Sequence, residues 1–421
     1  MTDPKSRARV SALHTPSGIE IWHVEDYTVP VLSLEVAFLG GAAHDPAGQS
    51  GLTSFVASML DEGAGSLHSE EFQEALEDKA IELSFGASRD RLSGSMRSLA
   101  EHAGSAFDLL GMAMLSPRFD ADAIERVRGQ IISGLKRDET DPQVLTRDAL
   151  YRIAFDGHAY GHPVDGSIPS VQAITRDDLM AQARRLMTRK TLIVVAVGAI
   201  SADSLVTGVE RAFGALPGDV GLGRLPAAVM KGAGHREIIT LDIPQSTLYL
   251  AIPGIARKDP DFISAHVVNH ILGGGSFTSR LWTEVREKRG LAYSVWSGLR
   301  WSAHADMFMA GTATSNERVA ESLSVIDAEI RRMAEGGPTI EELTKAKAYL
   351  TGSYALQFDT SRKIADHLLM LRADGLPIDY TDRRNDEITA VGLDEAKAAA
   401  ARLFGNAKPL VVATGRPVGL A

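Results

Sequence analysis

The chain has 421 residues, too many for one ordinary hydrophobic core, so two or possibly three domains are expected. Its formal net charge of −10 argues against a broad surface for nucleic acids or anionic membranes, because such surfaces need clustered cations. The sequence contains no cysteine, which excludes disulfides, thiolate zinc sites and cysteine nucleophiles.

Alternating apolar residues predict strands, and segments with helical periodicity predict helices between them. In chain order these are a strand at 30–40, helices at 69–79, 99–114 and 121–137, strands at 191–200 and 246–254, helices at 317–334 and 340–356, and a strand at 409–415. Strands and helices are mixed without regular βαβ alternation. The pattern therefore favours an α+β fold class.

The two halves of the sequence follow similar patterns. The first runs strand, "GGAAHDPAG", helix and "GAGS", and the second runs strand, "PGIARKDPD", helix and "GGGS". Repetition at half the chain length indicates duplication of one domain. Residues 214–234, rich in Gly and Pro, separate the halves. We therefore predict domains at 1–215 and 236–421, joined by a linker at 216–235.

The segment "GLTSFVASMLDEG" (51–63) predicts an amphipathic helix. Its other face carries Ser54, Ala57 and Ser58. Taken alone, this pattern indicates an ordinary half-buried helix with small residues where another layer packs. The expected core stripe is Leu52, Phe55, Val56, Met59 and Leu60.

The frame G-L-x-x-F-x-x-x-M, followed by a Gly at 63, resembles the pitrilysin-type zinc metallopeptidases, the inverzincins, whose signature on this helix is H-x-x-E-H. In that family the two His bind zinc and the Glu activates the metal-bound water. Here these positions are Ser54, Ala57 and Ser58. The family's third ligand, a Glu on a later helix, falls at Gly134 when counted back from "DETDP". The resemblance implies a degenerate zinc motif and no metal bound by this chain.

The segment "GGGSFTSRLWTEVREKRGLAYSVWSG" (273–298) resembles the C-terminal region of the same family. The resemblance implies that Arg286 and Tyr293 contact a scissile peptide, with Arg289 as a weaker candidate for the Arg. A guanidinium can donate to carbonyl oxygens, and a phenol can stabilise an oxyanion. The alternative is that Arg286 pairs with a neighbouring Glu, such as Glu284 or Glu287, and Tyr293 packs locally. The family's substrate-accepting edge strand corresponds to 82–88.

The resemblance is to the bacterial and mitochondrial-processing-peptidase-like subfamily, in which one chain forms half of a clamshell. It implies two homologous domains, each a mostly antiparallel sheet packed with helices. It also implies a non-catalytic subunit of a heteromeric zinc metallopeptidase. The partner would be a homologous subunit that carries an intact motif and the zinc. Arg286 and Tyr293 would then act in trans on peptide substrates.

Two other readings stay open. One is a non-enzymatic structural or peptide-binding scaffold of the same fold. The other is a metalloprotein that uses His266 and His270, four residues apart, although Asn269 stands where a carboxylate base would be needed. The first residues contain no apolar run of leader-peptide length and the chain has no membrane-spanning run, so we expect the cytoplasm, or the bacterial periplasm if a leader has been removed.

Overall fold

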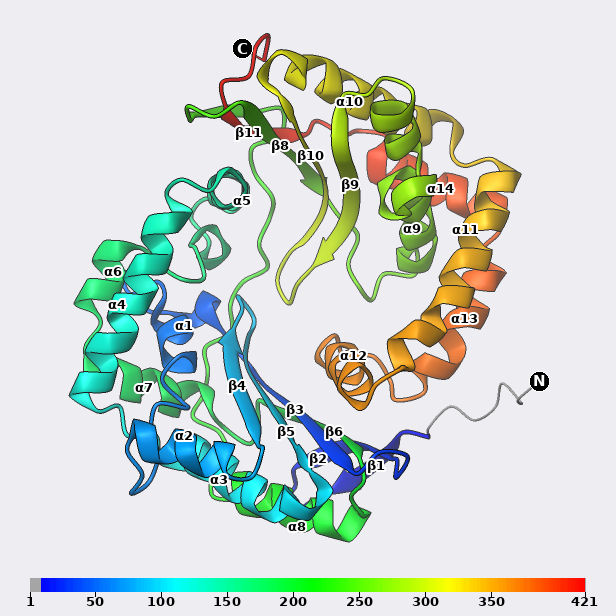
Figure 1. Cartoon of the computed structure of the whole chain (residues 1–421). Helices are drawn as coiled ribbons and strands as arrows, with labels where there is room; N and C mark the ends of the chain where they lie inside the picture. The colour runs from blue at the N-terminus through cyan, green and yellow to red at the C-terminus, as the bar shows by residue number, and fades with distance from the viewer. Residues whose placement is uncertain (1–8, 421) are drawn as a thin grey trace. The chain divides into compact units, whose positions relative to one another are not determined.

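The computed structural model describes residues 9–420, which form two compact units (Figure 1). The first unit contains the chain up to Leu135, together with Pro163–Arg224 and Leu356–Tyr380. The second contains Lys136–His162, Leu225–Ala355 and the chain from Thr381 onward. Each unit is built on one sheet with helices packed against it, and each has its own hydrophobic core.

The sheet of the first unit has six strands in the order β1-β2-β6-β3-β5-β4. Neighbouring strands are antiparallel except β2 and β6. On β3, alternate residues such as Leu34 and Val36 face the larger core, whereas Ala37 lies in a smaller cluster on the other side. The strands are β1 (Ser11–His14), β2 (Glu20–Glu25), β3 (Val31–Leu39), β4 (Glu82–Ala87), β5 (Arg91–Leu99) and β6 (Leu192–Gly198).

Helices bury both faces of this sheet. The smaller apolar cluster joins Trp22 and Val195 of the sheet to Leu368 of α12 (Ser361–Ala373), and Arg372 of α12 donates to the carbonyl oxygens of Glu20 and Val194. The larger core contains side chains from the remaining helices. These are α1 (Leu52–Ala57), α2 (Ser69–Glu77), α3 (Ala103–Leu115), α4 (Ala121–Asp138), α6 (Ile168–Ala173), α7 (Arg176–Leu186) and α8 (Ala202–Phe213).

The sheet of the second unit has five strands in the order β7-β11-β8-β10-β9. They are β7 (Arg236–Thr240), β8 (Gln245–Pro253), β9 (Ala292–Trp301), β10 (Asp306–Ser315) and β11 (Leu410–Gly415). The helix α5 (Pro142–Ala154) packs on β8 and β11. The other helices of this unit are α9 (Phe262–Asn269), α10 (Val319–Gly336), α11 (Ile340–Gly352), α13 (Tyr380–Ala390) and α14 (Leu393–Phe404).

The two sheets have the same topology. The order β2-β6-β3-β5-β4 matches β7-β11-β8-β10-β9, and each sheet has one parallel pair at the same place. The matching strands β6 and β11 both end in a glycine with positive φ, 139° at Gly198 and 144° at Gly415. A Cβ at Gly198 would lie 2.1 Å from the Val31 carbonyl oxygen, so only glycine fits there. The predicted α+β class with two related, mostly antiparallel sheets is confirmed.

The compact units are not contiguous in sequence. The predicted division at 1–215, 216–235 and 236–421 follows the duplication, whereas residues 136–162 belong to the second unit and residues 356–380 to the first. Among the helices of residues 9–420, none is long and apolar enough to cross a membrane.

Candidate functional site

A buried polar network fixes the start of α1. The Asp45 carboxylate accepts hydrogen bonds from the backbone N–H groups of Gly51 and Thr53, at 3.0 Å each, and from the Thr53 hydroxyl at 2.5 Å. The side-chain amide of Gln182 on α7 donates to the same hydroxyl at 3.0 Å. Burial raises the pKa of Asp45 to about 6, against the lowering effect of these hydrogen bonds. The network therefore ties α1 to α7.

We expect Thr53→Val to lower the free energy of local opening at α1 by about 1–3 kcal/mol, because it leaves the buried Gln182 amide without this acceptor and Asp45 without one donor. Hydrogen exchange of peptides covering residues 45–60 measures this change. Ser58→Ala is the matched control, since the Ser58 side chain is exposed and bonds only a backbone carbonyl. Equal exchange in both variants would contradict the role given to the network.

The apolar face of α1 is core, as the sequence predicts. The helix ends at Ala57 and continues as turns, so it is shorter than the segment 51–63. The five stripe residues are each at most 1% exposed: Leu52, Phe55, Val56, Met59 and Leu60.

The four positions of the degenerate motif carry no metal ligand. The Ser54 hydroxyl donates to Asp165 at 2.7 Å, and the Ser58 hydroxyl donates to the Ser54 carbonyl at 3.0 Å. Ala57 is buried, and Gly134 is a half-buried position on α4. These residues do not fit a zinc ion, which takes imidazole, thiolate or carboxylate. In the described part of the chain, no three His, Cys, Asp or Glu side chains form a group that could hold a metal.

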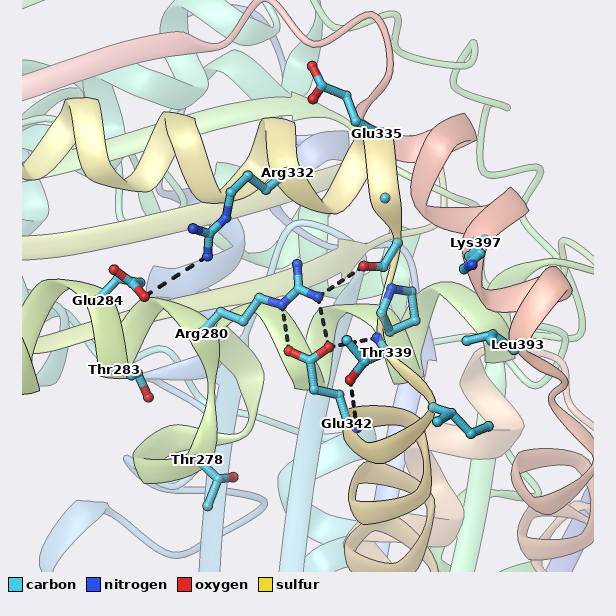
Figure 2. Close-up of a pocket in the computed structure, with 14 residues that line it drawn as sticks. Thr278, Arg280, Thr283, Glu284, Arg332, Glu335, Thr339, Glu342, Leu393 and Lys397 are labelled. Atoms are coloured by element: carbon cyan, nitrogen blue, oxygen red, sulfur yellow. Dashed lines mark hydrogen bonds and ion pairs between the residues drawn. The ribbon is translucent and has the colours of Figure 1, made fainter.

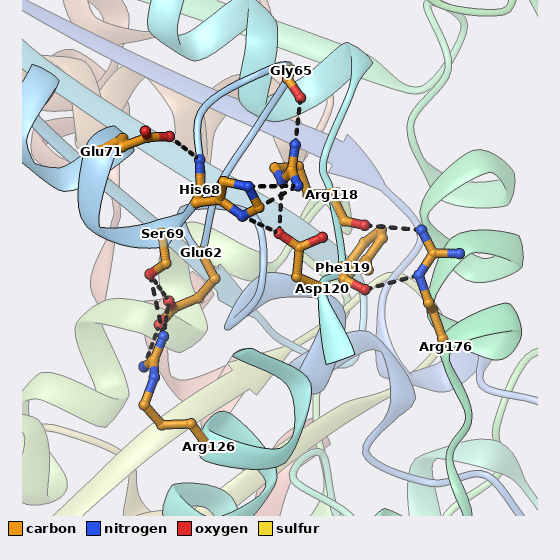
Figure 3. Close-up of polar contacts among 10 residues, drawn as sticks. All are labelled: Glu62, Gly65, His68, Ser69, Glu71, Arg118, Phe119, Asp120, Arg126 and Arg176. Atoms are coloured by element: carbon orange, nitrogen blue, oxygen red, sulfur yellow. Dashed lines mark hydrogen bonds and ion pairs between the residues drawn. The ribbon is translucent and has the colours of Figure 1, made fainter. Parts of the chain in front are cut away.

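Two carboxylates beyond α1, Glu62 and Asp120, are engaged by cations, as Figure 3 shows. The Arg126 guanidinium pairs with Glu62, which also accepts from the Ser69 hydroxyl at 2.6 Å. Burial raises the pKa of Glu62, but these hydrogen bonds outweigh it and the net pKa is lowered. Nearby, Asp120 binds Arg118 at 2.6 Å and His68 at 3.1 Å. These ion pairs were not predicted from the sequence, and they leave the Glu62 carboxylate committed to protein donors.

Arg286 and Tyr293 lie together in the second unit. Arg286 is on a π-helical segment, Trp282–Glu287, and Tyr293 is at the start of β9. The guanidinium carbon lies 4.4 Å from the centre of the Tyr293 ring and 4.2 Å from that of Trp282. Tyr293 is 80% exposed. Across residues 9–420, neither the guanidinium nor the phenol hydroxyl forms an ion pair or hydrogen bond with another group.

Within residues 9–420, the alternative pairing of Arg286 with Glu284 or Glu287 is absent. Glu284 instead accepts from Lys288 at 2.7 Å and from Arg289 at 2.6 Å, and these hydrogen bonds lower its pKa. Arg289, the weaker candidate from the sequence, is therefore held by an ion pair, whereas Arg286 keeps its donors.

The glycine-rich turn before this segment allows close packing against β9. A Cβ on Gly273 would lie 2.8 Å from the backbone nitrogen of Ser297 and 2.6 Å from its hydroxyl oxygen. That hydroxyl donates to the side-chain oxygen of Asn269 at 2.9 Å. A larger residue at 273 would push the turn away from the strand that carries Tyr293.

His266 and His270 are unsuited to a metal pair. Burial, together with the charges of Arg384, His270 and Arg257, lowers the pKa of His266 to about 4. Burial also lowers the pKa of His270, whose ring stacks on Tyr349 with centroids 5.0 Å apart. Positive charge next to His266 would oppose a bound cation.

The second unit also contains a pocket of about 950 Å³ between α10, α11, α14 and the segment before Arg286. Figure 2 shows Arg280 at its centre. The guanidinium makes two hydrogen bonds of 2.7 Å to Glu342 and one of 2.9 Å to the Gly337 carbonyl. Burial raises the pKa of Glu342, but the Arg280 hydrogen bonds and others bring it down to about 2. This ion pair fastens the start of α11, and no local pattern indicates it because its two residues are 62 positions apart.

Comparison with known proteins identifies the family. The insulinase (peptidase family M16) model matches residues 23–167, and the peptidase M16 inactive domain model matches residues 173–350. Together the two models span most of the chain. Each corresponds mainly to one half of the duplication.

Curated relatives extend over nearly the whole chain. The non-peptidase homolog YmxG of Helicobacter pylori is 27% identical over 378 residues, which cover 90% of this chain and 87% of that protein. An uncharacterized zinc protease of Streptomyces coelicolor is 27% identical over 385 residues, which cover 89% and 83%.

Solved structures agree with these matches. The peptidase M16 inactive domain from Pseudomonas fluorescens has a TM-score of 0.92 at 27% identity, covering 97% of this chain and 98% of that one. A protease from Helicobacter pylori has a TM-score of 0.87 at 16% identity, which shows a shared fold. The chain therefore belongs to the peptidase M16 family, in which it is a non-catalytic, M16-like protein.

Proposed function

We propose that this protein is the non-catalytic subunit of a heteromeric zinc peptidase. One observation carries the proposal. The positions of the zinc motif are filled by small residues that pack or bond to protein groups, while Arg286 and Tyr293 keep unused donors together on one surface. A homologous partner with an intact H-x-x-E-H helix would supply the zinc and the general base.

The chemistry of the retained pair suits peptide hydrolysis. Attack on a peptide carbonyl creates a negatively charged oxygen, and donors placed at that oxygen lower the barrier. Arg286 and Tyr293 can provide such donors because neither is occupied by a neighbouring carboxylate or carbonyl among the described residues. The same donors can hold the carbonyl groups of a bound peptide.

The edge strand β4 supports peptide binding in the first unit. It lies at one end of the sheet, next to β5 alone, at the place the family resemblance gives to the substrate strand. An extended peptide could add to its free edge through backbone hydrogen bonds.

The test is peptidase activity against a quenched fluorescent peptide. This chain alone, a zinc-motif homologue from the same genome alone, and the two together are measured at equal concentrations. We expect hydrolysis to appear or rise at least tenfold only in the mixture. A stable complex should accompany it on size-exclusion chromatography. No complex and no gain would favour the scaffold function, and zinc-dependent hydrolysis by this chain alone would contradict the assignment of its motif.

A scaffold or peptide-binding protein without an enzymatic role is the second candidate. The contacts of Arg286 with Trp282 and Tyr293 are compatible with it, because a purely structural cation–π contact would have the same geometry. It predicts peptide binding or assembly that does not depend on the Arg286 donors.

A further inference from the structure

Arg286 and Tyr293 belong to a continuous stack of four side chains, which we call the aromatic ladder. Its members are Phe277, Trp282, Arg286 and Tyr293. Phe277 meets Trp282 edge to face, with ring centroids 4.5 Å apart. Trp282 then meets the Arg286 guanidinium at 4.2 Å, and the guanidinium meets Tyr293 at 4.4 Å. The ladder therefore runs from the glycine-rich turn, through the π-helical segment, to the start of β9.

The ladder is anchored at its second member. Trp282 is 8% exposed, whereas Phe277 is 68% exposed and Tyr293 80% exposed. The backbone N–H of Trp282 donates to the Ser279 hydroxyl at 3.3 Å, which fixes the start of this segment. The indole is thus the buried, fixed surface against which the guanidinium lies.

The kind of contact that holds Arg286 determines which of its N–H donors remain available to a ligand. A salt bridge occupies in-plane N–H donors of a guanidinium, as Glu284 does for the Nη1 group of Arg289. A cation–π contact uses the face of the guanidinium and leaves its in-plane donors free. A Trp at position 282 can therefore hold the group in place without blocking it.

We propose that Trp282 is a positioning residue for Arg286. Its indole holds the guanidinium against a fixed surface, with the donors available to a peptide carbonyl beside the Tyr293 hydroxyl, and Phe277 packs edge to face on the indole. The catalytic consequence of this rests on the proposed function, whereas the restraint on Arg286 belongs to this chain alone.

The restraint is tested on the full-length chain without a partner. Phenylglyoxal attacks free guanidinium groups, and mass spectrometry gives the rate at each arginine. We expect Trp282→Leu to raise the rate at Arg286 roughly threefold to tenfold, the range that a cation–π contact of this kind supplies, with Trp282→Phe in between. Trp296→Leu is the matched control, because it removes an indole 5.6 Å from Arg300 on β9. It should leave the Arg286 rate unchanged.

An unchanged Arg286 rate in both Trp282 variants would overturn the proposal. If Trp282→Leu does not fold, the modification rate at Arg286 is measured in Trp282→Phe and Phe277→Leu instead. Each substitution weakens the ladder, leaves the core volume nearly filled and should raise this rate. Circular dichroism identifies a variant that has lost its fold.

The consequence for catalysis is tested by a double-mutant cycle in the mixture with the zinc-motif homologue. Trp282→Leu should lower kcat roughly threefold to tenfold in the native background and have no further effect beside Arg286→Ala. Equal losses in both backgrounds would show a merely structural role and overturn the positioning assignment. If Trp282 protects Arg286 from phenylglyoxal but the mixture never hydrolyses peptide, the proposed function is wrong. The restraint of Arg286 by Trp282 is then still supported.

Discussion

Replacing Glu35 with Gln should stabilise the first unit by an amount that grows with pH. Glu35 is 6% exposed on β3, under α12, where burial and the charge of Asp366 raise its pKa to about 8 despite the opposing charge of Arg362 and a hydrogen bond from Ser95. The folded state therefore holds a proton that the unfolded state releases near pH 4.5.

The sign of the effect follows from this difference in bound protons. As the pH rises from about 4.5 to about 8, the wild type loses unfolding free energy, because the unfolded carboxylate is ionised and the buried one is not. Glutamine does not titrate. We expect the difference between Glu35→Gln and wild type to grow from near zero at pH 4.5 to roughly 4 kcal/mol at pH 8.5.

Trp22 provides the measurement, because it lies in the same apolar cluster as α12. The other three tryptophans all belong to the second unit and are replaced by Phe in both proteins: Trp282, Trp296 and Trp301. Urea unfolding followed by Trp22 fluorescence then reports the first unit. Glu101→Gln, at an exposed position, is the control and should follow the wild type at every pH. Parallel curves for Glu35→Gln and wild type would contradict a protonated Glu35.

The strands that the sequence located are those with long alternating apolar runs. The predicted segments 30–40, 191–200, 246–254 and 409–415 correspond to β3, β6, β8 and β11, which are the central strands of the two sheets. Apolar residues are nearly continuous in these segments, as expected of strands that are packed on both faces. By contrast, serine, glycine and arginine make up two thirds of β5 (Arg91–Leu99), so its pattern is too polar to predict a strand.

The exchange of helices between the units could not be predicted in the same way. α5 and α12 each have an apolar face, but helical periodicity states only that a face is buried and not which sheet buries it. The choice depends on tertiary packing across sequence separations of more than a hundred residues, such as the Arg372 to Glu20 contact.

In the candidate site, too, local contacts could be predicted from the sequence and contacts between distant residues could not. Trp282 and Arg286 are four residues apart on a helical segment, so their contact is a local feature that the sequence could have indicated. The Arg126 to Glu62 pair joins residues 64 positions apart. The residues next to Arg126 and Glu62 do not indicate this ion pair, because each side chain resembles an ordinary solvated charge in the sequence.

Removing the donors of Arg286 or Tyr293 should give the largest change in activity of any single substitution in this chain. In the mixture with the zinc-motif homologue, we expect Arg286→Ala and Tyr293→Phe each to lower kcat on the order of a hundredfold to a thousandfold, as the loss of one oxyanion donor does elsewhere. Tyr293→Phe should leave KM nearly unchanged, because it removes only the hydroxyl.

Arg289→Ala is the matched control for Arg286→Ala. Both change an arginine in the same short segment to alanine, but the Nη1 group of Arg289 donates to the carbonyl and the carboxylate of Glu284, which hold this guanidinium against the protein. We expect its effect on kcat to be less than about threefold, because the ion pair is partly exposed on its Arg289 side and Lys288 still holds Glu284 when Arg289 is removed. Steady-state kinetics on one peptide, with complex formation checked for each variant, separates a loss of chemistry from a loss of assembly.

The exposure of Arg286 and Tyr293 to solvent explains why they should not promote hydrolysis without a partner subunit. Tyr293 is 80% exposed in this chain, and a donor in water stabilises a developing charge only weakly. Covering the site with a partner surface and a bound peptide would exclude water and strengthen the same donors. If Arg286→Ala and Arg289→Ala proved equal in the mixture, the retained pair would be structural, and the scaffold function would take precedence.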